Sequence, residues 1–222
     1  MLSPVLLAGF ICFFQHQHFL NLHKPQSSNS RHQNRQKQKD NWSAFIRLTL
    51  VVIGRSIIFY SMITYIPLYW MDRFNQSEAS GGMALSILTV SGVVGSVWGG
   101  KLSDRFGYLK IILVGFLLLV PCLPVLFLVE SIPMATALLI PIGILLSLTY
   151  APTVVLGQQF LPNHIGLSSG VTLGIAVAVG GVAAPIVGNL ADDYGIQTAM
   201  IGMALLPIPV VCMAWNITSS LD

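Results

Sequence analysis

A charged side chain, Arg55, stands about eleven residues into a long apolar stretch that begins near Ala44. An arginine in the middle of a membrane-spanning helix costs roughly 2.5–3.5 kcal/mol on insertion scales, so it must face a bundle interior or a wet cavity. Two interpretations of Arg55 remain open. It lines a substrate path, where it meets an anionic group of the substrate or a carboxylate in a missing part of the protein, or it is a snorkelling or structural arginine satisfied by helix carbonyls.

Enzyme and metal chemistry fit the sequence less well. The run Gly166-Leu-Ser168-Ser-Gly170 matches the GxSxG motif of serine hydrolases, but it precedes an apolar helix and no histidine follows it. An intramembrane serine protease is therefore the weaker alternative. The histidines before residue 41 follow no common ligand spacing, and Cys12, Cys122 and Cys212 lie in apolar runs without a CxxC pair. The sequence predicts no enzyme, no metal site and no cofactor.

The composition indicates a chain whose solvent is lipid. Of its 222 residues, 54% are apolar and only 9% are charged, whereas an ordinary soluble domain has about 25% charged residues. The net charge of +3 is concentrated between apolar runs, which is typical of membrane topology rather than of nucleic-acid binding. We expect the lipid bilayer as a partner and no nucleic acid.

Six apolar stretches are long enough to cross the bilayer, which requires roughly 20 residues of helix. The predicted spans are Ala44–Trp70, Gly82–Lys101, Lys110–Val129, Pro133–Phe160, Leu167–Ala191 and Ile196–Ile217. Short connections between them predict a bundle of antiparallel neighbours at residues 44–218. The sequence therefore predicts an all-α membrane protein.

The segment before this bundle has two parts. Residues 1–14 are apolar but too short to span, and we interpret them as the stub of a preceding transmembrane helix. Residues 15–43 are polar and basic, which predicts a flexible linker. Threading the spans alternately places nine basic residues on one side and only Arg73 in an opposite loop. By the positive-inside rule, the linker and the C-terminus are predicted to be cytoplasmic.

An internal repeat carries the architecture. Gly100-Lys-Leu-Ser-Asp104-Arg-Phe-Gly107 recurs as Gly188-Asn-Leu-Ala-Asp192-Asp-Tyr-Gly195, offset by 88 residues. Because this offset equals three spans, the copies must lie on opposite faces, as in a 3+3 inverted repeat. The glycines permit close helix approach and tight turns, and the aspartate can hold a helix N-terminus. We interpret the two turns as latches with a gating role, carried by Gly100, Asp104, Arg105, Gly107, Gly188, Asp192 and Gly195.

Residues 99–110, Gly-Gly-Lys-Leu-Ser-Asp-Arg-Phe-Gly-Tyr-Leu-Lys, resemble the signature loop of the major facilitator superfamily. In that family the loop joins helices two and three and reappears between helices eight and nine. The resemblance implies that the six spans are helices seven to twelve of a major facilitator fold, and that the basic linker is the central cytoplasmic loop. It also implies alternating access between two six-helix halves around a site near the midplane.

A narrower resemblance covers residue 44 to about residue 217. Phe160-Leu-Pro-Asn-His-Ile-Gly-Leu-Ser-Ser-Gly170, Gly180-Gly and Gly188-Asn-Leu-Ala-Asp192 are similar to fosmidomycin-resistance-type efflux proteins. This implies export of an unknown small molecule or drug across a bacterial cytoplasmic membrane. The family normally carries twelve helices, so we expect a partner half: an N-terminal six-helix half, as a separate chain or as missing sequence, or a second copy. The alternative is a truncated fragment or accessory membrane protein without transport activity.

Other polar and small residues have expected roles within this scheme. Gln158, Gln159 and His164 cluster at an inner helix end, where they form part of a cytoplasmic gate or are ordinary interfacial residues. No Asp or Glu falls within a predicted span, so proton-coupling chemistry is expected elsewhere. Prolines within the spans are expected to kink helices. The spacings Gly95/Gly99 and Gly170/Gly174 predict close helix contacts.

Overall fold

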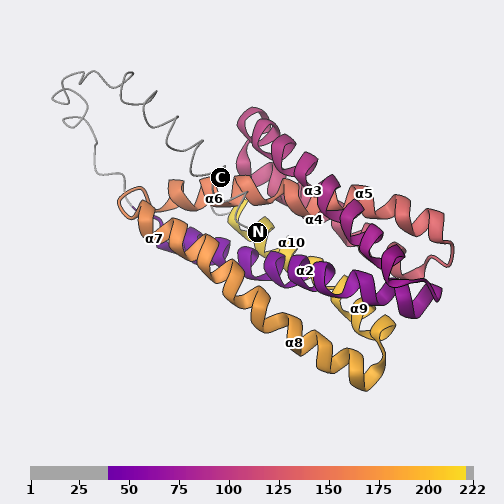
Figure 1. Ribbon diagram of the computed structural model, residues 1–222. Coiled ribbons are helices and arrows are strands. Elements are labelled where there is room, and N and C mark those ends of the chain that lie inside the picture. The colour runs from indigo at the N-terminus through magenta and orange to yellow at the C-terminus, as the bar shows by residue number, and fades with distance from the viewer. Residues whose placement is uncertain (1–39, 219–222) are drawn as a thin grey trace, which may run out of the picture. The chain divides into compact units, whose positions relative to one another are not determined.

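The computed structural model describes residues 40–218, and every regular element in that range is a helix (Figure 1). The predicted stub at residues 1–14 and the linker up to residue 39 lie outside the described residues. Six helical spans in the described range are long and apolar enough to cross a membrane. The expectation of an all-α, six-span membrane bundle is confirmed.

Three spans are single helices and three are interrupted. The first three are α2 (Trp42–Phe74), α3 (Glu78–Phe106) and α4 (Tyr108–Leu128). The fourth consists of α5 (Ile132–Leu148) and α6 (Tyr150–Phe160), and the fifth of α7 (Ile165–Gly170), the π-helix η1 (Val171–Ile175) and α8 (Ala176–Tyr194). The sixth consists of α9 (Ile196–Ala204) and α10 (Pro207–Thr218). Several predicted spans were too short, because helices continue into charged terminal turns that hydropathy excludes.

Two of the interruptions have a proline as their cause. Pro152 has no N–H for the carbonyl of Leu148, and the helix breaks at Thr149. Ahead of Pro207, the N–H groups of Leu205 and Leu206 bond three residues back, to Gly202 and Met203. The π-helix η1 has no proline and was not predicted. Pro67, Pro121, Pro124, Pro141 and Pro185 lie inside continuous helices and do not interrupt them, so the kinks expected there stay a prediction.

The helix contacts follow the symmetry of the sequence repeat. Span two packs most extensively on span four, as α3 on α5, and the symmetry-related contact joins span five to span one, as α8 on α2. Likewise α4 packs on α5 and α10 packs on α2, while α4 and α10 contact each other. Each triplet of spans therefore makes equivalent contacts with the other, which is the architecture expected of a 3+3 repeat.

The two triplets run in opposite directions. At the start of α3, Gly81 lies against the carbonyl of Pro67, near the end of α2, so α3 begins beside the last turns of α2 and runs back toward the opposite end of the bundle. The Tyr65 hydroxyl, also near the end of α2, donates a 2.6 Å hydrogen bond to the carbonyl of Ala184 in the second half of α8. The helix α8 therefore ends at the same end of the bundle as α2. The turn at Gly107 and the turn at Gly195 thus lie at opposite ends of the bundle (Figure 1).

Both turns of the repeat have the same backbone conformation. Gly107, between α3 and α4, has φ 95° and ψ 141°, and Gly195, between α8 and α9, has φ 84° and ψ 148°. L-residues with a side chain rarely adopt a φ of this kind, which explains why glycine stands at both positions. The sequence repeat is therefore also a repeat of local structure.

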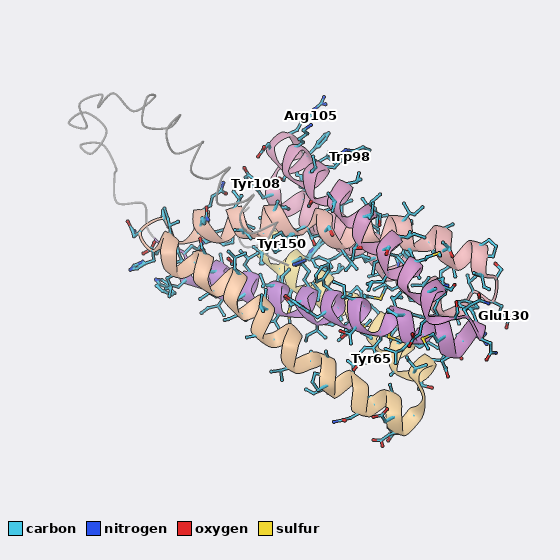
Figure 2. All side chains as sticks on the ribbon, in the orientation of Figure 1. Tyr65, Trp98, Arg105, Tyr108, Glu130 and Tyr150 are labelled. Carbon is cyan, nitrogen blue, oxygen red and sulfur yellow. The ribbon has the colours of Figure 1, made fainter. Side chains whose placement is uncertain are left out.

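The two ends of the bundle differ in charge. We name them the Arg105 end and the Glu130 end, after two residues labelled in Figure 2. Among residues 40–217, the Arg105 end carries Asp40, Arg47, Lys101, Asp104, Arg105 and Lys110. The Glu130 end carries Asp72, Arg73, Glu78, Glu130, Asp192 and Asp193. Basic residues exceed carboxylates at the Arg105 end, and the reverse holds at the Glu130 end.

Glycines bring the backbones of α3 and α5 into direct contact. A Cβ at Gly95 would collide with the carbonyl of Ile144, one at Gly99 with the carbonyl of Leu148, and one at Gly143 with the carbonyl of Leu88. The predicted close contact at Gly95/Gly99 is therefore present. At Gly170 and Gly174 no other described element comes within 4 Å of where a Cβ would stand, so close packing was the wrong expectation there.

Replacing Gly95 with alanine should lower the thermal unfolding midpoint of the detergent-purified protein, because the Cβ would push against backbone. Overpacking of this kind costs about 1–3 kcal/mol. Gly82→Ala is the matched control in the same helix, since no atom lies within 4 Å of a Cβ there. Alanine has the higher helix propensity, by about 1 kcal/mol, so the control should be neutral or stabilising. Equal midpoints for both variants would contradict the packing described.

Candidate functional site

A cavity of about 330 Å³ lies within the bundle, between spans one, two, four and five. Its walls come from α2, α3, α5, the first residue of α6, η1 and α8, and neither α4 nor the sixth span contributes. Spans one and four are related by the repeat, as are spans two and five. The cavity therefore has symmetry-related walls, and Tyr150, one of its lining residues, lies between the Arg105 and Glu130 ends in Figure 2.

Arg55 forms part of the cavity wall and is only 5% exposed. Its Nη1 donates a long hydrogen bond of 3.5 Å to the carbonyl of Leu146, in the last turn of α5. Its Cζ lies over the Tyr150 ring, 4.8 Å from the centroid, and 5.5 Å from the Phe59 centroid. Both interpretations of Arg55 from the sequence thus find a basis, since a helix carbonyl contacts the residue and the residue faces a cavity.

No carboxylate among residues 40–217 lines the cavity with Arg55. All the carboxylates in this range lie in the terminal turns or loops at the two ends of the bundle. The guanidinium stays charged in proteins, and one long hydrogen bond and two ring faces use few of its five N–H donors. The site can therefore provide an electropositive surface inside an otherwise apolar wall.

The cavity lies beside irregular backbone. Tyr150 follows the break at Thr149, and Leu173, another lining residue, belongs to η1. A second, much smaller cavity lies between Arg55, Tyr150, Thr153 and Thr172. Sequence reasoning identified Arg55 but missed Tyr150 and η1. Pro152 was the available signal for the break, whereas a π-helix has no comparable signature.

The three residues of the predicted cytoplasmic gate do not form one cluster. Gln158 Nε2 donates a 2.9 Å hydrogen bond to Ser169 Oγ, which joins α6 to α7. The Gln159 side chain is exposed. The His164 imidazole lies 3.1 Å from a carboxylate oxygen of Asp40, and its ring is 5.9 Å from that of Trp42. The structure thus places Gln158 and His164 in two separate helix-joining contacts at the Arg105 end.

Asp40 fastens the start of α2 to the turn between α6 and α7. Besides contacting His164, its carboxylate accepts 3.2 Å hydrogen bonds from the backbone N–H and the side-chain amide of Asn163. Next to it, the N–H of Asn41 bonds to the carbonyl of Phe160. Desolvation opposes ionisation of Asp40, but these hydrogen bonds and the His164 contact together lower its pKa. The sequence placed Asp40 in the linker and missed this role.

The turn residues of the repeat form local contacts. The Asp104 carboxylate accepts a 2.9 Å hydrogen bond from the Tyr108 hydroxyl, and Arg105 lies over the Phe106 ring. Gly188 lies against the Tyr65 hydroxyl, whereas a Cβ at Gly100 would meet open space. Close helix approach therefore holds for Gly188 and for Gly99, but not for Gly100. Asp192, at the opposite end of the bundle, is exposed.

The GxSxG match does not assemble a hydrolase site in this region. Ser168 is fully buried and faces Gly157, and the His164 ring is engaged with Asp40. A serine nucleophile requires an accessible hydroxyl within hydrogen-bond reach of a base. The arrangement of these residues therefore does not fit the serine protease alternative.

The six long apolar helices of the described range define a multi-pass membrane protein. The chain belongs to the Major Facilitator Superfamily, whose sequence pattern it matches over residues 1–185. The resemblance drawn from the repeated turn is therefore confirmed.

Two curated relatives support the assignment. The chain is 26% identical over 208 residues to the fosmidomycin resistance protein of Escherichia coli (strain K12), a match covering 94% of this chain and 50% of that protein. It is 32% identical over 140 residues to the uncharacterized MFS-type transporter YfnC of Bacillus subtilis (strain 168), covering 63% of this chain and 34% of that protein. The chain therefore spans at most half the length of these relatives.

Solved structures give the same fold. A bacterial homolog of the human lysosomal transporter Spinster, in an inward-facing, unoccupied conformation, matches with a TM-score of 0.63 and 14% identity. That match covers 80% of this chain and 48% of the homolog. The occupied conformation matches with a TM-score of 0.62 and 13% identity, over 79% of this chain and 49% of the homolog.

The Asp40 contacts predict a pH-dependent tether. A folded-state pKa below the ordinary value means that the tether is complete above about pH 4 and is lost as the pH falls through the lowered pKa. Hydrogen exchange at the Asn163 amide, corrected for the intrinsic rate, should be slower at pH 7 than below the lowered pKa of Asp40. Asp40→Ala should raise the rate at pH 7 and weaken this pH dependence, whereas Asp72→Ala, at the other end, should change neither. Unchanged protection in Asp40→Ala would contradict the tether.

Proposed function

We propose that this chain is one half of an alternating-access carrier that exports small molecules. The observation that carries the proposal is the cavity beside Arg55, whose walls come from two pairs of repeat-related spans. In transporters built from repeats, the substrate site lies near the bilayer midplane at the interface between repeats, and the bundles rock around it. We assign the remaining wall of the site to an N-terminal six-helix half.

Export is the direction that the relatives favour. One of them is named for fosmidomycin resistance, and export of a drug is the simplest way for a transporter of this superfamily to confer resistance. We place the protein in the inner or plasma membrane, with the linker and the C-terminus in the cytoplasm. The excess of basic residues at the Arg105 end supports this orientation.

We assign a role in the transport cycle to the turns at Gly107 and Gly195. Gly107 and Gly195 hold equivalent sharp turns at opposite ends of the bundle. We assign them to latches that engage the other half alternately, one on each side of the membrane. The contacts of Asp40 with Asn163 and His164 would then hold the end of the central linker against the turn between α6 and α7.

Orientation is tested with single cysteines in a background lacking Cys12, Cys122 and Cys212. A membrane-impermeant maleimide added to intact cells should label Asp192→Cys and should leave Asp104→Cys unlabelled until the cells are opened. Both positions are exposed in the structure, so neither result depends on burial. Labelling of both cysteines from the same side would contradict the inverted arrangement and the carrier with it.

Transport is tested in an efflux-deficient bacterial strain that expresses this chain alone or together with an N-terminal half from the superfamily. Efflux of a fluorescent drug should require both parts, because one half does not enclose the site. Arg55→Leu in the paired protein should reduce the efflux rate by about tenfold or more, as expected when a charge-assisted hydrogen bond is lost. Unaltered efflux by the Arg55→Leu protein would remove Arg55 from the substrate path.

A second candidate function is an accessory membrane protein or fragment without transport activity. The observation that favours it is that no carboxylate among residues 40–217 lines the cavity, so this part of the chain offers no acidic group there for proton coupling. The same assay separates the two candidates. No efflux from the paired protein, with both parts folded in the membrane, would support the accessory role.

A further inference from the structure

We infer that the cavity beside Arg55 binds small amphipathic anions, with a single negatively charged head group at Arg55 and an apolar, preferably aromatic, body against the opposite wall. This inference rests on the proposed transport function, because it treats the cavity as the substrate site. It adds the chemical class of the substrate, which follows from charge, geometry and the nature of the walls.

The charge balance of the cavity favours an anionic ligand. Arg55 is buried to about the extent of the core residues, yet every carboxylate among residues 40–217 lies toward an end of the bundle. Its hydrogen-bond acceptor, the Leu146 carbonyl, is neutral and distant at 3.5 Å. A buried cation compensated only by dipoles and ring faces gains most from a ligand that brings a full negative charge.

The geometry of the Arg55 guanidinium favours an acceptor with two oxygens. Tyr150 and Phe59 contact it through their ring faces, at 4.8 and 5.5 Å from the centroids. Ring faces attract the cation without accepting several of its N–H groups in normal hydrogen bonds. The edges of the planar guanidinium remain suited to a two-oxygen acceptor such as a carboxylate or a sulfonate.

The remaining walls of the cavity favour a ligand with an apolar body. Leu88, Leu146 and Val177 are apolar, and Phe59, Tyr60 and Tyr150 are aromatic. Two hydroxyls of the wall, Thr89 and Ser96, already donate to carbonyls of their own helix. Ser147, Tyr60 and Tyr150 add further hydroxyls to the lining, but Arg55 is the one charged side chain among the described lining residues, which favours one charged head on a largely apolar body.

These features also discriminate against other ligands. A cation would be repelled by Arg55, and the cavity lining contains no carboxylate to compensate for it. A neutral compound of the same shape would fill the apolar space but leave the buried charge without a counter-ion. A site that contains a buried polar group rejects ligands that lack the group with which it would form a hydrogen bond.

The test compares three ligands with the same naphthyl body on the purified full chain in nanodiscs: 2-naphthaleneacetate, 2-naphthaleneethanol and 2-(2-naphthyl)ethylammonium. Dissociation constants are measured by isothermal titration. The anion should bind about ten to a hundred times more tightly than the alcohol, as expected for a charge-assisted hydrogen bond, and the ammonium more weakly than the alcohol. 2-Naphthalenesulfonate should behave like the carboxylate, which shows that the site recognises the anion rather than one acid group.

Variants then assign the selectivity to Arg55. Arg55→Gln should bring the affinity for the anion down to that for the alcohol, and Arg55→Lys should keep part of the preference. Arg47→Gln is the matched control, because Arg47 lies on the same helix but bonds to the carbonyl of Asn216 outside the cavity. It should leave all dissociation constants unchanged. Unfolding midpoints of each variant confirm that binding is compared between folded proteins.

Four outcomes overturn the inference: equal or tighter binding of the alcohol or the ammonium, no binding of any of the ligands by the folded chain, an anion preference that survives in Arg55→Gln, or a preference lost in Arg47→Gln. The comparison of ligands on the unaltered chain decides the question even where a variant does not fold. Efflux without charge selectivity would overturn this inference and leave the carrier standing. Charge-selective binding without efflux by the paired protein would contradict the carrier instead.

Discussion

The absence of water inside a bilayer is the constraint on which this structure depends. Every backbone N–H and C=O in the hydrocarbon must find a partner within the protein, which restricts the spans to helices. Lipid tails are as apolar as leucine, so the helices associate through close packing rather than through the hydrophobic effect. The glycines at 95, 99 and 143 meet this requirement, because they let α3 and α5 approach until backbone touches backbone. The most extensive helix contact of the bundle thus depends on its smallest residues.

The same constraint explains where irregular backbone occurs. The break at Thr149 and the π-helix η1 both adjoin the cavity beside Arg55, since Tyr150 and Leu173 line it. Non-helical backbone is tolerated at membrane depth where it is enclosed by protein or lines a cavity. The cavity therefore brings together the buried Arg55, the break at Thr149, the π-helix η1 and apolar walls. Its placement between repeat-related spans gives it walls from both triplets.

Much of this architecture could be predicted from the sequence, because hydropathy and the Gly-x-Leu-small-Asp turns are local signals. They identified six spans, their inverted relation and the superfamily. The helix ends were misplaced where charged residues such as Glu78 and Asp104 continue a helix beyond the apolar stretch. The contacts of Asp40 with Asn163 and His164 join residues more than 120 positions apart, and no local pattern encodes them. The π-helix was missed for a different reason, since its sequence is compatible with an ordinary α-helix.

The unequal charge of the two ends has an electrical consequence. Within residues 40–217, the Glu130 end carries five carboxylates and one arginine, and the Arg105 end four basic residues and two carboxylates. In a membrane with a negative interior, each unit charge carried across the full potential is worth about 2.3 kcal/mol per 100 mV. A molecule with its basic end inside lies with the field, and an upside-down copy would lie against it. The membrane potential therefore favours the orientation in which the Arg105 end faces the cell interior.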